Sequence, residues 1–163
     1  WIGYTLSWSF RQFDDINGGE RYFFTYDRRH DISVVMSHDF TDNISFSGAW
    51  VYGTGRAVTL PEYAYLTNLP DGLSWWDGMQ ELVERPSDKN AYRMSPYHRL
   101  DLSLSFKKEK RHFDRWWVFS TYNTYKNLNP FFIETATDDN GNPGLREYGL
   151  FPLIPSVAYR IKF

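Results

Sequence analysis

The chain has 163 residues, of which 20 are acidic, 18 are basic and 20% are aromatic, and it contains no cysteine. The basic residues are scattered and balanced by acidic ones, so the sequence gives no sign of a basic surface that binds nucleic acid. The lack of cysteine excludes disulfides and thiolate metal ligands. A mean hydropathy of -0.56 and apolar runs of at most four residues exclude a transmembrane helix, which needs about 20 mostly apolar residues.

Apolar and polar residues alternate in three segments of the first half of the chain, at about 1–12, 28–40 and 44–58. The apolar parity consists of Ile2, Tyr4, Leu6, Trp8 and Phe10, then Ile32, Val34, Met36 and Phe40, then Ile44, Phe46, Trp50 and Tyr52. A period of two predicts β-strands with one apolar and one polar face. Residues 41–43, Thr-Asp-Asn, predict a tight turn between the second and third strands.

Three further strands are expected in the second half, at about 93–107, 115–137 and 145–163. The apolar parity consists of Leu100, Leu102, Leu104 and Phe106 in the first segment and of Val157, Tyr159 and Ile161 in the last, while in the middle segment Trp117, Phe119 and Thr121 alternate with Val118, Ser120 and Tyr122. The register of the segment 115–137 is ambiguous, because both of its parities carry bulky residues. Only every second residue of such strands needs to face lipid, so a hydrophilic average composition is compatible with a membrane β-barrel.

The connections between these strands alternate in length. Residues 41–43 and 107–114 form short turns, whereas residues 13–27 and 60–91 form longer connections, and the second is expected to be a long extracellular loop. If the C-terminus is periplasmic, all longer connections fall on the outer side, as in outer-membrane barrels. The charged residues Arg28, Asp31, Arg99 and Asp101 are candidates for a charged lumen wall, either paired and solvated or contacting a plug or solute.

Several stretches resemble, in order and spacing, the C-terminal barrel portion of TonB-dependent outer-membrane transporters, and most of all the Bacteroidetes-type receptors. They are YDRRHD at 26–31, YGTG at 52–55 leading into Leu60 and Pro61, YHRLD at 97–101, YNTY at 122–125, NPFF at 129–132 and PLIPS at 152–156, with a terminal Phe. The resemblance covers most of the chain.

The resemblance implies an antiparallel up-and-down β-barrel of roughly 22 strands in the outer membrane of a Gram-negative cell, with a plug in its lumen. Residues 1–163 would be about six C-terminal strands of a longer protein, without the plug domain. Such a receptor imports a scarce nutrient (an iron chelate, vitamin, glycan or peptide). The implied partners are the remaining strands and plug, outer-membrane lipid, the barrel-assembly machinery, and TonB through the N-terminal part.

Two groups of residues are candidate sites under this interpretation. Tyr159, Ile161 and Phe163 resemble the terminal signal that the barrel-assembly machinery recognises, or they simply end an amphipathic edge strand. The aromatic residues Tyr63, Tyr65, Trp75 and Trp76 in the expected loop could stack on a ligand, although interface anchoring and loop packing explain them equally well.

No catalytic, cofactor or metal site is expected. The chain has no Gly-x-Ser-x-Gly elbow, phosphate loop or dinucleotide fingerprint, its four histidines lack metal-ligand spacing, and Asp138, Asn140 and Asn142 predict a turn rather than a calcium loop. Two other functions stay open: a non-transporting outer-membrane surface protein whose loops bind a partner, and a soluble all-β binding domain.

Overall fold

The structure is a computed structural model that describes residues 1–68, 80–137 and 143–163, with only the backbone described at 61–68, 80–86, 137 and 143. The fold is all-β and is built around one open, antiparallel six-stranded sheet. In spatial order its strands are β1 (Ile2–Leu6), β4 (His30–Thr41), β5 (Ile44–Gly53), β10 (Tyr97–Glu109), β11 (Asp114–Tyr122) and β14 (Ile154–Lys162). The outer edges of β1 and β14 have no partner strand among the described residues.

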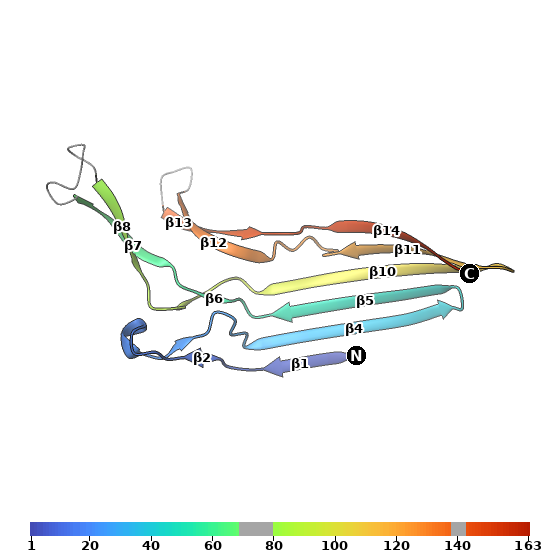
Figure 1. Cartoon of the computed structure of the whole chain (residues 1–163), viewed down its shortest axis with the longest axis horizontal. Coiled ribbons are helices and arrows are strands. Elements are labelled where there is room, and N and C mark those ends of the chain that lie inside the picture. Colours follow the sequence, from blue (N-terminus) through green and yellow to red (C-terminus); the bar gives the residue numbers. More distant parts are fainter. Residues whose placement is uncertain (69–79, 138–142) are drawn as a thin grey trace.

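Small two-stranded sheets occupy one end of the six-stranded sheet, on the left of Figure 1. They pair β2 (Phe10–Arg11) with β3 (Tyr22–Phe23), β6 (Ala57–Val58) with β9 (Tyr92–Arg93), β7 (Pro61–Asn68) with β8 (Gln80–Pro86), and β12 (Pro130–Thr137) with β13 (Pro143–Gly149). A 3-10 turn, η1 (Asn17–Gly19), lies between β2 and β3. We call this end of the molecule the outer end.

The opposite end carries the two short turns, from β4 to β5 and from β10 to β11, together with the C-terminus (Figure 1). The amide of Asn43 donates a hydrogen bond of 3.2 Å to the Thr41 hydroxyl and so stabilises the first turn. The longer connections all lie at the outer end, as their lengths in the sequence predict. We call the end with the short turns the inner end.

The register of the sheet places the alternating apolar residues on one common face. Leu104 lies opposite Phe46 on β5 and Phe119 on β11, and Phe119 lies opposite Val157 on β14. Val34 similarly lies opposite Ile2 and Trp50. Directly opposed residues of antiparallel strands point to the same face, so the six apolar parities combine into one continuous apolar surface.

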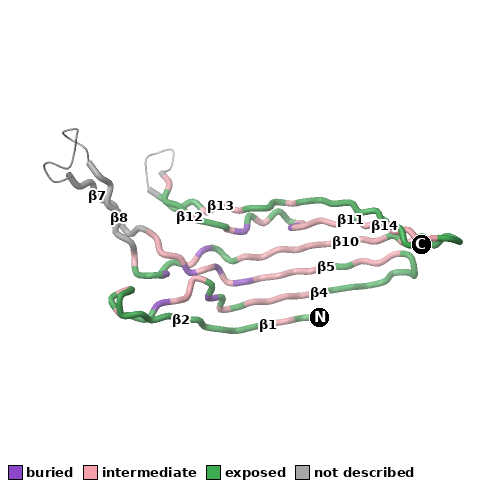
Figure 2. The backbone as a smooth tube through the Cα atoms, in the orientation of Figure 1, coloured by how far each residue is buried: buried purple, intermediate pink, exposed green. Residues whose placement is uncertain are grey.

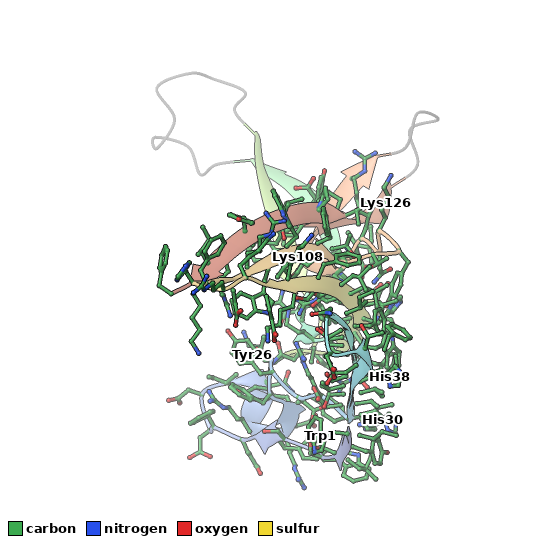
Figure 3. All side chains as sticks on the ribbon, turned by 90° about the vertical axis from the view of Figure 1, so that its right-hand side faces the viewer. Trp1, Tyr26, His30, His38, Lys108 and Lys126 are labelled. Atoms are coloured by element: carbon green, nitrogen blue, oxygen red, sulfur yellow. The ribbon has the colours of Figure 1, made fainter. Side chains whose placement is uncertain are left out.

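The apolar face is the convex face of the sheet. Seen along the strands, the sheet curves, and His30 and His38 lie on its convex side (Figure 3). His30 is in register with Leu6, and His38 with Phe46, so both share the apolar face. The polar parity therefore lines the concave face.

Five of the six expected strands are interrupted at the outer end, and only the segment 28–40 is a single strand, β4. The segment 1–12 ends as a strand at Leu6 and resumes as β2, so Trp8 and Phe10 lie outside the six-stranded sheet. The segment 44–58 divides between β5 and β6, and the segment 93–107 between β9 and β10. Hydrogen bonds to the neighbouring outer segments replace the ladder of the large sheet at these positions; one joins the Met94 amide to the Arg56 carbonyl at 3.0 Å.

The segments 115–137 and 145–163 are likewise each two strands rather than one. β11 ends at Tyr122, and the following turn places Asn123 and Lys126 in the left-handed region, at φ values of 53° and 58°. Phe151, with φ of 57°, separates β13 from β14. Left-handed residues cannot continue a strand, so the chain leaves the large sheet at these turns and forms the β12–β13 pair.

The connection 60–91, expected as a loop, contains β7 and β8. These strands pair in antiparallel register from Tyr63 opposite Arg85 to Asn68 opposite Gln80. The sequence pattern did not predict this hairpin because apolar residues occur at both parities in β7, as at Tyr63, Ala64 and Tyr65. Residues 69–79 at its tip lie outside the described residues.

The apolar face of the large sheet is not covered by another layer of described residues. Among the side chains that the structure describes, only Tyr22, Ala57 and Met94 are buried and apolar, and they lie in the small strands or beside them. Met36 and Val157 on the convex face are 54% and 61% exposed. Figure 2 shows buried positions gathered at the outer end of the strands rather than along them. The fold therefore lacks the two-layer core of a soluble sandwich within the described part of the chain.

Gly55 tests the packing of the outer end. A Cβ added to Gly55 would lie 1.7 Å from the Met94 backbone oxygen, so Gly55→Ala must force two backbone segments apart. Such overpacking costs typically about 1–3 kcal/mol. We expect Gly55→Ala to lower the midpoint of thermal unfolding, measured by circular dichroism on the full-length protein.

Gly144→Ala is the matched control, because the nearest atom to its added Cβ lies 3.8 Å away. Its midpoint should equal that of the unsubstituted protein. Equal midpoints for both variants would contradict the close approach at Gly55.

Candidate functional site

The concave face of the sheet carries small polar side chains at its centre. One row crosses five strands in direct register, because Ser37 pairs with Ser47, Ser47 with Ser103, Ser103 with Ser120, and Ser120 with Ser156. The hydroxyl oxygens of Ser120 and Ser156 are 2.7 Å apart, within hydrogen-bond distance. We call this row the serine row. Its side chains are short and polar, so the centre of the concave face carries no bulky group.

A shallow cavity of about 400 Å³ lies over the serine row. Its lining combines small side chains with an acid and an aromatic ring at its outer side: Val35, Ser47, Ala49, Asp101, Ser103, Ser120, Tyr122, Ile154 and Ser156. The cavity exists because the strands carry no long side chains here. The concave face can therefore bring another polar segment or solute close to the sheet backbone.

A charged cluster closes the outer side of this cavity. The Arg99 Nε donates to Asp101 Oδ2 at 2.9 Å, and Arg99 Nη1 donates to the hydroxyls of Tyr97 at 2.9 Å and Tyr122 at 2.8 Å. The guanidinium also lies 4.2 Å from the centre of the Tyr122 ring. The second oxygen of Asp101 accepts from the backbone amide of Asn123 at 2.9 Å. Arg99 is thus fixed in place with its charge balanced by Asp101.

The second pair of expected lumen charges lies next to this cluster. Arg28 Nη1 is 3.4 Å from Asp31 Oδ2, and the Arg28 guanidinium lies 5.8 Å from the ring centre of Tyr97. In the register of the sheet, Asp31 and Tyr97 both lie opposite Gly53. Arg28, Asp31, Arg99 and Asp101 therefore gather at the outer end of the concave face as two internally paired couples. The contacts show that the four charges are paired with one another, whereas their place in a lumen wall stays a prediction.

The connections at the outer end are joined by buried polar contacts. Asp27, whose side chain is fully buried, accepts from the Ser9 amide at 2.5 Å and forms an ion pair with Arg93. Arg93 also donates to the carbonyls of Asp27 at 2.9 Å and Gly55 at 3.1 Å. This pair therefore joins the connection between β1 and β4 to the connection between β5 and β10. The sequence contained no signal for it, because Asp27 and Arg93 are 66 residues apart.

Two buried asparagines have the same joining role. Asn90 Nδ2 donates to the Phe23 carbonyl at 2.7 Å, and the amide of Asn90 donates to Thr59 Oγ1 at 3.0 Å. Asn123 Nδ2 donates to the carbonyls of Asn127 at 2.8 Å and Phe151 at 3.0 Å. Hydrogen bonds consequently join the described outer connections to one another and to the strands.

The remaining expected site residues have different outcomes. Tyr159, Ile161 and Phe163 lie on or just after β14 with exposed fractions of 46%, 43% and 95%, and the Tyr159 ring lies 4.7 Å from that of Trp117. Tyr63 and Tyr65 belong to β7, where only the backbone is described, while Trp75 and Trp76 lie outside the described residues. The expected turn at Asp138, Asn140 and Asn142 also lies outside them.

Within the described ranges, no group of three or more His, Asp or Glu side chains could hold a metal ion. None of the helical segments described is long and apolar enough to cross a membrane. Searches of known protein families, curated proteins and solved structures find no match to this chain.

The Asp27–Arg93 pair should dominate the stability of the outer end. Asp27→Asn removes the charge while keeping the shape, and it leaves Arg93 beside a neutral partner. Breaking a buried ion pair in this way typically costs about 3–5 kcal/mol. We expect a matching loss in the free energy of unfolding, measured by denaturant titration.

Asp88→Asn makes the same chemical change at an exposed position of a neighbouring connection. It should change the unfolding free energy by less than about 0.5 kcal/mol. A loss of similar size in both variants would show that the Asp27 ion pair contributes no more to the free energy of unfolding than an exposed carboxylate does.

Proposed function

We propose that this chain is part of the wall of an outer-membrane β-barrel, and that the barrel is a TonB-dependent receptor that imports a scarce nutrient. The observation that carries the proposal is the continuous, uncovered apolar surface on the convex side of a sheet whose concave side is polar. A soluble protein rarely leaves so large an apolar surface in contact with water, whereas a barrel wall requires it.

The positions of aromatic residues on the convex face support a membrane span. An inner group consists of Phe46, Phe106, Trp117 and Tyr159, and an outer group of Tyr4, Trp50, Tyr52, His98 and Tyr125. In the outer group the Tyr125 hydroxyl lies 3.2 Å from Trp50 Nε1 and 2.8 Å from His98 Nδ1.

The outermost members of the two aromatic groups are separated by a distance suited to a bilayer. On β10 the step from His98 to Phe106 corresponds to about 26 Å along the strand, at about 3.3 Å per residue. A strand tilt of about 40° reduces this to about 20 Å along the membrane normal, close to the apolar band of roughly 25 Å in outer-membrane barrels. Aromatic side chains with polar tips favour both membrane interfaces.

The open edges of the sheet support a larger barrel. The nine residues of β14 are all exposed, and its outer edge offers unpaired backbone groups. In hydrocarbon, each unpaired group costs several kcal/mol, so β1 and β14 need further strands beside them. Additional strands and the plug of the same receptor are the proposed partners, and the barrel-assembly machinery is proposed to recognise Tyr159, Ile161 and Phe163.

The receptor family is proposed from the quoted sequence stretches, and their residues have structural reasons to occur together. YDRRHD contains Asp27 and the pair Arg28–Asp31, YGTG contains Gly55, and YHRLD contains Arg99 and Asp101. These residues form the outer end of the concave face and join the connections above it. A fixed outer mouth of this kind suits a receptor that captures a solute before import.

Lipid contact can be tested with two neighbouring residues on opposite faces. Leu104 lies on the convex face, between Phe46 and Phe119, and Ser105 lies on the concave face, between Ser45 and Val118. An arginine near the middle of a barrel's lipid face costs roughly 2–4 kcal/mol, and lumen positions tolerate charge. We expect Leu104→Arg to reduce severely the amount of folded protein in outer-membrane fractions, whereas Ser105→Arg should leave it near normal.

Equal recovery of the two variants from the membrane fraction would contradict the assignment of the faces. Recovery of the unsubstituted full-length protein without detergent, in the soluble fraction, would instead favour the soluble binding domain.

The transport role is tested by combining loss of the protein with loss of TonB. Strains lacking the full-length protein are compared with the parent during growth on limiting iron, vitamins, glycans or peptides. A TonB-dependent receptor predicts a growth defect on one of these that disappears when TonB is already absent. A defect that persists without TonB, or loss of adhesion alone, would favour the non-transporting surface protein.

A further inference from the structure

A second cavity, of about 290 Å³, lies at the outer end beside β2 and β3. Its lining consists of two aromatic and three polar or basic side chains: Trp8, Phe10, Arg11, Gln12 and Arg21. The segment that contains β2, η1 and β3 lies on the concave side of the large sheet (Figure 3). None of these residues was a site candidate in the sequence.

The two arginines of this cavity are held by aromatic stacking. The Arg11 guanidinium lies 3.8 Å from the centre of the Phe24 ring, and that of Arg21 lies 3.9 Å from the centre of the Phe10 ring. Phe10 in turn stacks on Phe23, with ring centres 4.7 Å apart. The β2–β3 pairing sets this arrangement, because Phe10 lies opposite Phe23. The guanidinium groups are therefore oriented before any ligand arrives.

Neither arginine uses its hydrogen-bond donors within the described part of the chain. No described carboxylate lies within 4.0 Å of Arg11 or Arg21, although Asp14, Asp15 and Glu20 are in the same connection. Stacking occupies a face of a guanidinium, but its five N–H groups point outward in the plane. These donors are free to bind an anion in bidentate geometry.

A third arginine adds to the positive potential behind the cavity. Arg29 lies 5.6 Å from the centre of the Trp8 ring and 5.4 Å from that of Phe23, and its Nε is buried without a hydrogen-bond partner among the described residues. Trp8, which is 53% exposed, offers a flat apolar surface within the cavity itself. The cavity thus combines unneutralised guanidinium groups with an accessible aromatic ring.

We propose that this cavity binds an organic anion that carries a carboxylate on a flat ring. The carboxylate would accept hydrogen bonds from Arg11 and Arg21, and the ring would stack on Trp8. The binding site stands on the geometry of the cavity, while its use as the entry point for an imported solute rests on the proposed transport function.

Benzoate and benzamide are suitable probes, because they have nearly the same shape and differ in charge. Their affinities for the full-length protein, kept in detergent if it requires detergent, are compared by isothermal titration calorimetry at low ionic strength. We expect benzoate to bind at least about tenfold more tightly than benzamide, the size of one charge-assisted interaction. Equal affinities of the two probes would overturn the proposal without any substitution.

The double variant Arg11→Gln with Arg21→Gln tests the location. Its affinity for benzoate should fall about tenfold, to the level of benzamide, and Arg21→Gln alone should give an intermediate loss. The control, Lys110→Gln with Arg111→Gln, removes the same charge from the turn at the inner end and should leave benzoate affinity unchanged. An unchanged benzoate affinity in the Arg11 and Arg21 variant would also overturn the proposal.

The two proposals can fail separately. A preference for benzoate in a protein found in the soluble fraction would keep the anion site and remove its role in transport. A protein in the outer membrane that does not distinguish the two probes would keep the barrel and remove the anion site.

Discussion

The structure depends on one constraint: in six paired strands, side chains of opposite parity must face different surroundings. Because the register aligns Val34 with Trp50, and Leu104 with Phe46 and Phe119, every strand contributes its apolar side to the convex face. A slip of one residue in any pair would place an apolar row among the serines of the concave face. The observed register therefore keeps one face apolar and the other polar, and the apolar face is the convex one.

Polar contacts take over where this alternation ends. Beyond the strand ends, Asp27 with Arg93 and the buried Asn90 and Asn123 hold the connections together, since few apolar residues are buried there. Arg99 and Asp101 continue this network onto the concave face and border the cavity above the serine row. The paired charges and the cavity of Arg11 and Arg21 thus lie at the outer end, where binding a solute would not require residues of the convex face to move.

The six strands could be predicted from the sequence because their pattern is local and has a period of two. The expected faces of Leu100, Leu102, Leu104 and Phe106 agree with the register, as do the short turns after Thr41 and Glu109.

The interruptions at Asn123 and Phe151 could not be predicted, because left-handed conformations there depend on contacts with distant segments. The β7–β8 hairpin lacked clear alternation. A pairing of Arg28 with Asp31 can be expected from the sequence, because the two residues are only three positions apart. The cavity of Arg11 and Arg21 could not be predicted, because it depends on the register of β2 with β3.

The central claim is that the convex face contacts hydrocarbon and the concave face contacts water or protein. Spin labels placed one at a time from Ser33 to Phe40 along β4, in the full-length protein in lipid, measure it most directly. Accessibility to oxygen, which partitions into hydrocarbon, should peak at Val34, Met36 and His38, and accessibility to an aqueous quencher at Ser33, Val35 and Ser37. Uniform exposure of all eight positions to the aqueous quencher would contradict the account.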